Sequence, residues 1–193
     1  ETGPVAVFVV AQRLDEQAPL NPSSPYAASK IAAEEILQDY FKVRGLPVVI
    51  GRPGNHTGPG QSPKFVVPAF VAAIRAYRDG AIPVVPVGNL ESERDFTDVR
   101  DVVEAYLLLL EKGTPGGVYN IAAGVHLRIG ELLERVARLA GVNPKVERRP
   151  ELYRPTDAFP ALETRRLREE TDWRPHYDLD RTLRDIWDEA EAR

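Results

Sequence analysis

The stretch PYAASKIAAEEILQDYFKVRGLPVVIGRP, residues 25–53, has the pattern of a helix followed by a buried strand. Ser24 is a favourable N-cap, Pro25 suits the first helical position, and Gly45 is a natural stop. Apolar side chains recur at helical spacing between these limits, at Ile31, Ile36, Leu37, Tyr40 and Phe41. The run LPVVIGRP, residues 46–53, is apolar apart from Arg52, which is typical of a strand buried on both faces. A helix that leads into such a strand indicates an α/β fold.

The alternation continues to the C-terminus, so we expect a parallel sheet covered by helices. Glycine and proline are dense in residues 54–64, which predicts a loop, and we expect a second loop at residues 151–160. Pro83 and Pro86 place the strand around them at a sheet edge. We expect the helices at residues 65–80, 98–113, 127–142, 162–170 and 180–192, and the strands at residues 5–10, 82–89, 117–124 and 145–150.

Composition limits the class of protein. The chain has 193 residues, enough for one domain, with 43% hydrophobic and 28% charged residues, as in ordinary globular proteins. No apolar run is long enough to span a membrane, and a net charge of −4 gives no general attraction to nucleic acid or anionic lipid. Cysteine is absent, which excludes disulfides and thiolate chemistry and favours a cytoplasmic setting. Methionine is also absent, even at position 1, so we expect a fragment or a processed product.

The residues Tyr26 and Lys30 lie four positions apart at the start of the first predicted helix and so share a helix face. A free tyrosine has a pKa of about 10, too high for easy proton exchange at neutral pH. A neighbouring ammonium group favours the phenolate and brings the phenol toward useful acid and base behaviour. The spacing also arises by chance in many helices, with the ring packed and the ammonium solvated. The pair alone leaves both interpretations open.

Five segments, taken in order, resemble the extended short-chain dehydrogenase/reductase family of NAD-dependent epimerases and dehydratases. They are PLNPSSPYAASKIAAEE, GRPGNHTGPGQSPKFV, VGNLESERDFTDVRDVVEAY, GVYNIAAG and RPTDAFPALETRRLREETDWRP. Within that family the chain looks most like the reductases of GDP-4-keto-6-deoxymannose and the GDP-mannose 4,6-dehydratases. HTGPGQSP and RDFTDVRDVV are the most specific parts of the likeness.

The resemblance implies a role for each matching residue. Tyr26 matches the catalytic tyrosine, which protonates the keto oxygen in a reductase, and Lys30 matches the lysine that holds the nicotinamide ribose and lowers the tyrosine pKa. Pro53 ends the strand beside the nicotinamide, and His56 matches a cofactor contact. Asn55 resembles a contact to the sugar nucleotide.

Further substrate contacts are implied at Lys64, at Arg94, and at Arg154 and Asp157 in YRPTD. Arg94 resembles the arginine that meets the nucleotide diphosphate, and its alternative is a surface ion pair with Asp95 or Asp98. His56 and Asn55 have the alternative of satisfying the backbone of their own loop. No metal belongs to the implied site.

The resemblance implies the C-terminal part of a Rossmann-like parallel sheet with helices on both faces, plus a small α/β substrate-binding subdomain. Residues 1–60 would form the distal half of the dinucleotide-binding fold, and residues 61–193 mainly the substrate-binding subdomain, with residues 97–125 returning to the sheet. The glycine-rich turn that binds a pyrophosphate is absent from the sequence, because GPGQ lacks the spacing. The family's catalytic serine or threonine is also without a match, since Thr2 is a poor substitute. VAVFVV stands where relatives are expected to carry a polar loop.

Two functional hypotheses follow. The first is an NAD(P)-dependent reduction of a nucleotide-linked 4-keto-6-deoxy sugar, with NADP or NAD as cofactor, a GDP-sugar as substrate and a homodimer as the assembly, in which this chain alone is inactive. A GDP-mannose 4,6-dehydratase or a nucleotide-sugar epimerase is the enzymatic alternative. The second hypothesis is a non-catalytic remnant that binds sugar nucleotides or another subunit. Reductase is favoured over dehydratase because no carboxylate pair for water elimination can be placed near Tyr26, Glu1 being the one candidate.

Overall fold

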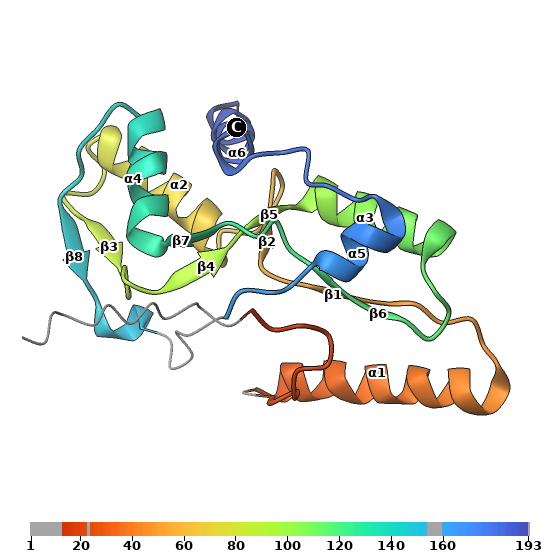
Figure 1. Cartoon of the computed structure of the whole chain (residues 1–193). Helices are drawn as coiled ribbons and strands as arrows, with labels where there is room; N and C mark the ends of the chain where they lie inside the picture. The colour runs from red at the N-terminus through yellow and green to blue at the C-terminus, as the bar shows by residue number, and fades with distance from the viewer. Residues whose placement is uncertain (1–12, 23, 154–159, 193) are drawn as a thin grey trace, which may run out of the picture.

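The computed structural model describes residues 13–22, 24–153 and 160–192 (Figure 1). The strand expected at Val5–Val10 lies outside these residues. The fold is α/β, as the sequence predicts, with short parallel strand pairs and helices packed around them. None of the helices in the described parts of the chain is both long and apolar enough to cross a membrane.

The first helix, α1, runs from Pro25 to Arg44 and begins and ends where the sequence predicts. The Ser24 hydroxyl accepts a hydrogen bond from the Ala27 N–H at 3.1 Å, and Gly45 ends the helix in the left-handed conformation at φ 66°. Glycine adopts this conformation without strain, which is why the helix stops there. The expected apolar stripe, however, is not a core stripe, because α1 has no buried residue.

One part of the structure is built on the parallel strands β1 (Ile50–Pro53) and β6 (Val118–Ile121), with Ile50 opposite Val118 and Pro53 opposite Ile121. Figure 1 shows α1 on one side of this pair and α3 (Val99–Lys112) on the other. The short helix α5 (Arg165–Thr171) packs against β6. The hydrophobic core of this first part of the structure contains Val102, Ala105, Leu109, Tyr119, Ile121, Leu167 and Trp173.

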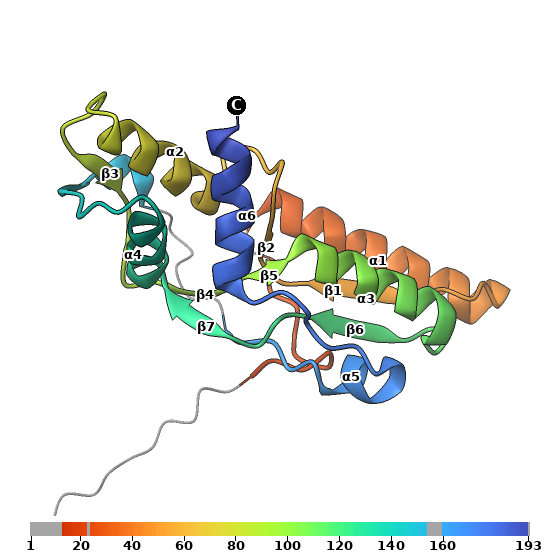
Figure 2. The same cartoon turned by 90° about the horizontal axis from the view of Figure 1, so that it is seen from above.

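The second part contains helices α2, α4 and α6, which pack against one another (Figure 2). Its core joins apolar residues from these helices to Val85 and Val87 of the parallel pair β3–β8. The elements are α2 (Val66–Arg78), β3 (Val85–Val87), α4 (Ile129–Leu139), β8 (Val146–Arg148), the 3-10 turn η1 (Pro150–Leu152) and α6 (Leu179–Glu191).

Four short strands were not expected from the sequence. They are β2 (His56–Thr57), β4 (Glu93–Asp95), β5 (Thr97–Asp98) and β7 (His126–Arg128). β2 lies within the segment 54–64 that we predicted to be a loop, and it pairs with β5 in parallel. β4 pairs with β7 in antiparallel orientation, which interrupts the expected parallel arrangement. Strands of two or three residues carry no periodicity, and here they form because distant segments meet, as when the Thr97 N–H donates to the Asn55 carbonyl at 3.0 Å.

Candidate active site

The predicted catalytic pair lies side by side on the first turns of α1. The Lys30 ammonium nitrogen is 5.4 Å from the centroid of the Tyr26 ring, within the range of a cation–π contact. The Tyr26 side chain is 72% exposed, and Lys30 is exposed as well. Both groups are therefore open to a ligand approaching from solvent.

An ion pair attaches this helix to the sheet one turn beyond Lys30. The Arg52 guanidinium of β1 donates from Nε to Glu34 of α1 at 2.9 Å and binds the same carboxylate through Nη2. It also donates from Nη1 to the Glu16 carbonyl at 2.9 Å. Because Arg52 immediately precedes Pro53, one side chain links the tyrosine helix to the end of the strand where the nicotinamide contact is expected.

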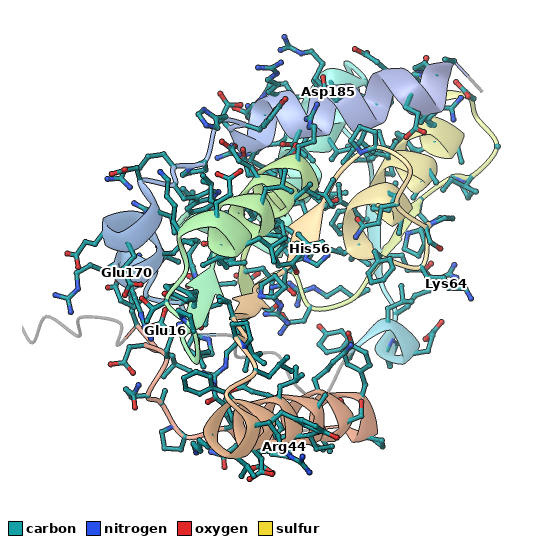
Figure 3. All side chains as sticks on the ribbon, turned by 90° about the vertical axis from the view of Figure 1, so that its right-hand side faces the viewer. Glu16, Arg44, His56, Lys64, Glu170 and Asp185 are labelled. Atoms are coloured by element: carbon teal, nitrogen blue, oxygen red, sulfur yellow. The ribbon has the colours of Figure 1, made fainter. Side chains whose placement is uncertain are left out.

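A second clamp holds the segment that leads into α1. The Glu16 carboxylate accepts a hydrogen bond from the backbone N–H of Asn120 at 2.8 Å, and Figure 3 shows Glu16 close to the sheet. The buried Asn120 amide donates to the carbonyls of Leu14 and Glu163 at 3.0 and 3.1 Å. The chain on the N-terminal side of Tyr26 is therefore bound to β6.

The residues Pro53, Asn55 and His56 lie together at the C-terminal end of β1, where ligands bind in open parallel sheets. The Asn55 carbonyl belongs to the β2–β5 ladder, and His56 Nδ1 lies 3.1 Å from the Gly54 carbonyl oxygen. His56 is exposed, and Asn55 and Pro53 are half-buried. The His56 side chain therefore contacts the backbone of its own loop, as the alternative interpretation expects. The Asn55 contact with Thr97 is made by the Asn55 backbone and not by its side chain.

The loop after His56 is fixed from two sides. The Gln61 amide donates to the His56 carbonyl at 3.1 Å, and the Thr57 hydroxyl donates to the Gln61 side-chain oxygen at 2.7 Å. The Gly60 N–H donates to the Glu189 carboxylate of α6 at 2.6 Å. The C-terminal helix therefore holds the loop that carries His56.

Of the predicted substrate residues, Lys64 and Arg94 belong to the second part of the structure. Lys64 is exposed just before α2, away from His56 in Figure 3. Arg94 is half-buried on β4, and its guanidinium donates to the Glu93 carbonyl at 2.7 Å. Arg154 and Asp157 lie outside the described residues.

The two carboxylates proposed as alternative partners of Arg94 have other partners. Asp95 accepts a hydrogen bond from the Gly124 N–H at 2.6 Å, and burial raises the pKa of this carboxyl above its usual value. Asp98 binds Arg100 and Thr182, and these hydrogen bonds outweigh burial and lower its pKa. Asp98 is thus a structural carboxylate at the start of α3.

Sequence reasoning missed Glu34, Arg52, Gln61 and Tyr106. Tyr106 of α3 lies over β1, because a Cβ atom added at Gly51 would come within 3.1 Å of its ring. Burial raises the pKa of Tyr106, and the Tyr26 phenol raises it further. A usable signal existed only for Glu34, which follows Lys30 by four residues and so faces the same side of the helix.

A hollow of about 620 Å³ lies elsewhere, between α4, the chain that follows it and Leu90. Its lining includes none of the predicted site residues. Among the described residues no group of histidine, aspartate or glutamate side chains is arranged to hold a metal ion.

Comparison with known proteins identifies the family. A model of the GDP-mannose 4,6 dehydratase family matches residues 8–186. The GDP-6-deoxy-D-mannose reductase of Pseudomonas aeruginosa is 35% identical over 175 residues, which are 90% of this chain and 58% of the relative. The dTDP-D-glucose 4,6-dehydratase of Homo sapiens is 38% identical over 128 residues, which are 66% of this chain and 35% of the relative. The chain thus spans little more than half the length of the reductase.

Solved structures give the same result. RMD from Pseudomonas aeruginosa, complexed with NADPH, is 34% identical and superposes with a TM-score of 0.87 over 97% of this chain and 63% of that chain. The UDP-glucose 4-epimerase of Thermus thermophilus, complexed with NAD, is 33% identical, with a TM-score of 0.82 over 94% of this chain and 58% of that chain. The chain therefore belongs to the GDP-mannose 4,6 dehydratase family, within the NAD-dependent epimerases and dehydratases.

Proposed function

We propose that the chain supplies the proton-transfer and substrate-binding residues for the NAD(P)-dependent reduction of a nucleotide-linked 4-keto-6-deoxy sugar. The observation that carries this proposal is the exposed Tyr26–Lys30 pair on one face of α1, in a chain that is 35% identical to a GDP-6-deoxy-D-mannose reductase. A GDP-linked sugar is the proposed substrate, and NADP or NAD the proposed cofactor, because solved relatives bind NADPH or NAD.

In this proposal Tyr26 is the general acid. A ketone becomes an alcohol when its carbon accepts a hydride and its oxygen accepts a proton, and the nicotinamide supplies the hydride when it is bound. The Tyr26 phenol donates the proton to the keto oxygen. The Lys30 ammonium, 5.4 Å from the ring centroid, stabilises the phenolate that this transfer leaves behind.

The residues present fit the nicotinamide ribose end of the cofactor. The exposed Lys30 ammonium can donate to ribose hydroxyls, and Pro53 stands at the C-terminal end of β1, the edge of a parallel sheet where such ligands bind. The backbone nest that binds the pyrophosphate has no counterpart in the sequence of this chain. The chain would therefore provide one end of the cofactor site.

Substrate binding is proposed for Asn55, Lys64 and Arg94, together with Arg154 and Asp157. Lys64 is an exposed cation at the start of α2, and Arg94 is a half-buried cation on β4. Positive side chains at these positions suit the diphosphate of a sugar nucleotide.

Reduction is preferred to dehydration because elimination of water needs a free carboxylate near Tyr26. Glu34, the carboxylate two turns beyond Tyr26 on the same helix, is occupied by Arg52. The likeness to dehydratases and epimerases keeps those two reactions as the alternatives to be tested.

A homodimer through α1 is part of the proposal. α1 buries none of its residues, and Ile36, Tyr40 and Val43, spaced by four and three positions, are 57%, 52% and 66% exposed. An apolar stripe of this spacing on an outer helix suits pairing with the same helix of a second copy.

The test joins this chain to the portion of the Pseudomonas aeruginosa reductase that it does not match. The fusion is mixed with a GDP-linked 4-keto-6-deoxy sugar and NADPH, and the product is analysed by mass spectrometry and NMR. A product two mass units heavier, with loss of NADPH absorbance, is expected. An unchanged keto sugar would favour the non-catalytic hypothesis. In a separate reaction with GDP-mannose as the only sugar nucleotide, its conversion to the 4-keto-6-deoxy form would favour a dehydratase.

A further inference from the structure

The two hydrophobic cores of the described chain share no residue. One joins β6, α3, Leu167 and Trp173, and the other joins α2, α4 and α6. Figures 1 and 2 show α6 with the second group and α3 with the first, so the two helices meet across the boundary between the cores. Two polar contacts join α3 to α6 at the first turn of α3.

Asp98, the N-cap of α3, is the centre of this junction. Its side chain is fully buried, and it accepts hydrogen bonds from the Arg100 backbone N–H at 2.8 Å and from the Arg100 guanidinium at 2.8 and 2.7 Å. It also accepts a 2.7 Å hydrogen bond from the Thr182 hydroxyl of α6. One buried carboxylate thus caps a helix of the first core and binds a helix of the second.

Arg100 crosses the same boundary. Its guanidinium binds Asp185 of α6 at 2.7 Å and stacks on the Tyr177 ring, with the guanidinium carbon 3.7 Å from the ring centroid. Arg181 contacts the same ring at 4.6 Å. Figure 3 shows Asp185 on α6 at the edge of the molecule, so the pair closes the outer side of the junction.

Asp101 binds the chain that runs between the cores. Its fully buried carboxylate accepts hydrogen bonds from the backbone N–H groups of His176 and Tyr177 at 2.9 and 3.1 Å. Its backbone carbonyl accepts one from the Trp173 indole at 3.0 Å. The first turn of α3 therefore binds both α6 and the segment that connects α5 to α6.

We infer that the first turn of α3 sets the orientation of the two cores, with Asp98 as a positioning residue. Tyr26 and Lys30 belong to the β1–β6 side, whereas Lys64 and Arg94 belong to the α2–α4–α6 side. For the reduction proposed above, on which this functional consequence rests, the angle between the cores determines whether a bound sugar nucleotide presents its keto group to Tyr26. A misplacement of about 1 Å costs roughly 100-fold in rate.

The variant Asp98→Asn tests the inference. Asparagine is isosteric and still caps the helix, so the fold is kept, but it loses the charge and the bidentate bond to Arg100. The matched control is Asp180→Asn, which removes the 2.8 Å ion pair between α6 and Arg135 of α4 inside a single core. Both substitutions replace an aspartate by asparagine, one at the boundary between the cores and one within a single core.

Because the sequence contains no cysteine, cysteines introduced at the exposed residues Glu111 of α3 and Arg138 of α4 carry the only spin labels. Double electron–electron resonance then measures the distance between the cores in the 193-residue chain. A narrow distribution is expected for the parent and for Asp180→Asn, and a broader one for Asp98→Asn at unchanged helix content by circular dichroism. An unchanged distribution in Asp98→Asn would overturn the inference.

The catalytic consequence is measured separately in the fused enzyme. Asp98→Asn is expected to raise the KM for the sugar nucleotide and to lower kcat/KM by roughly 100-fold, with the KM for NADPH unchanged. If the fusion has no activity, the proposed function fails while the distance measurement still decides the inference. Equal KM shifts for both ligands would contradict a positioning role.

Discussion

The Glu34 carboxylate of α1 binds the Arg52 guanidinium of β1, and through it the tyrosine helix is joined to the strand that ends at Pro53. Both side chains are largely buried, at 15% and 21% exposure. The pair therefore works in a low-dielectric setting, where removal of one partner leaves the other charge uncompensated.

Replacing Glu34 by glutamine is expected to destabilise the chain by about 2 kcal/mol, the usual range for losing hydrogen bonds to a charged group. Urea unfolding monitored by circular dichroism measures the change. Glu35→Gln, one position along on the exposed side of α1, is the control and should shift the midpoint little. An equal loss in both variants would show that the Arg52 contact does not hold the helix.

The junction at Asp98 predicts that the chain loses stability toward unfolding as the pH falls into the acidic range. Because hydrogen bonds to Arg100 and Thr182 lower the pKa of Asp98 below 3.8, the unfolded state takes up a proton first as the pH falls. The stability that Asp98 contributes is full above the unfolded pKa and is lost as the pH falls through the lower folded value. The urea midpoint should therefore fall less steeply below pH 4 in Asp98→Asn than in the parent, and parallel acid limbs would contradict this.

The exposed stripe of α1 predicts self-association. Tyr40→Glu places a charge at the centre of the apolar row and should convert a dimer into a monomer in sedimentation velocity. Asp39→Asn, beside it, is the control and should leave the dimer intact. A parent chain that sediments as a monomer at all concentrations would remove the basis for pairing through α1.

The sequence also predicts that the 193-residue chain by itself binds NADPH weakly or not at all. It carries no glycine-rich turn between a strand and a helix, so the backbone donors for a pyrophosphate are absent from it. Isothermal titration calorimetry measures the affinity directly, and a micromolar dissociation constant for the chain alone would refute the prediction.

The sequence predicted those parts of the fold that depend on local chemistry. Ser24, Pro25 and Gly45 limit α1 as expected, and the helices expected at residues 65–80 and 98–113 are present as α2 and α3. Caps, turns and long apolar runs act over a few residues, so they are visible in the sequence itself. The strands β2, β4, β5 and β7 were missed because their pairing depends on which distant segments meet.

The exposure of α1 could not be predicted from the sequence. Ile36, Leu37 and Tyr40 have helical spacing, but a period shows only that one face is apolar, not what covers it. At the site, Tyr26 and Lys30 were paired correctly in space because an i, i+4 spacing fixes their neighbourhood. Arg52 and Gln61 were missed because their partners become neighbours only in the folded chain.

The most direct test of the account is turnover by Tyr26→Phe in the fusion with the unmatched portion of the Pseudomonas aeruginosa reductase. NADPH absorbance is followed with a GDP-linked 4-keto-6-deoxy sugar, and Tyr40→Phe serves as the matched control on the same helix. General acid catalysis predicts that Tyr26→Phe loses about 100- to 10,000-fold in kcat while Tyr40→Phe stays near the parent. Parent-like turnover in Tyr26→Phe would contradict the assignment of proton transfer to Tyr26.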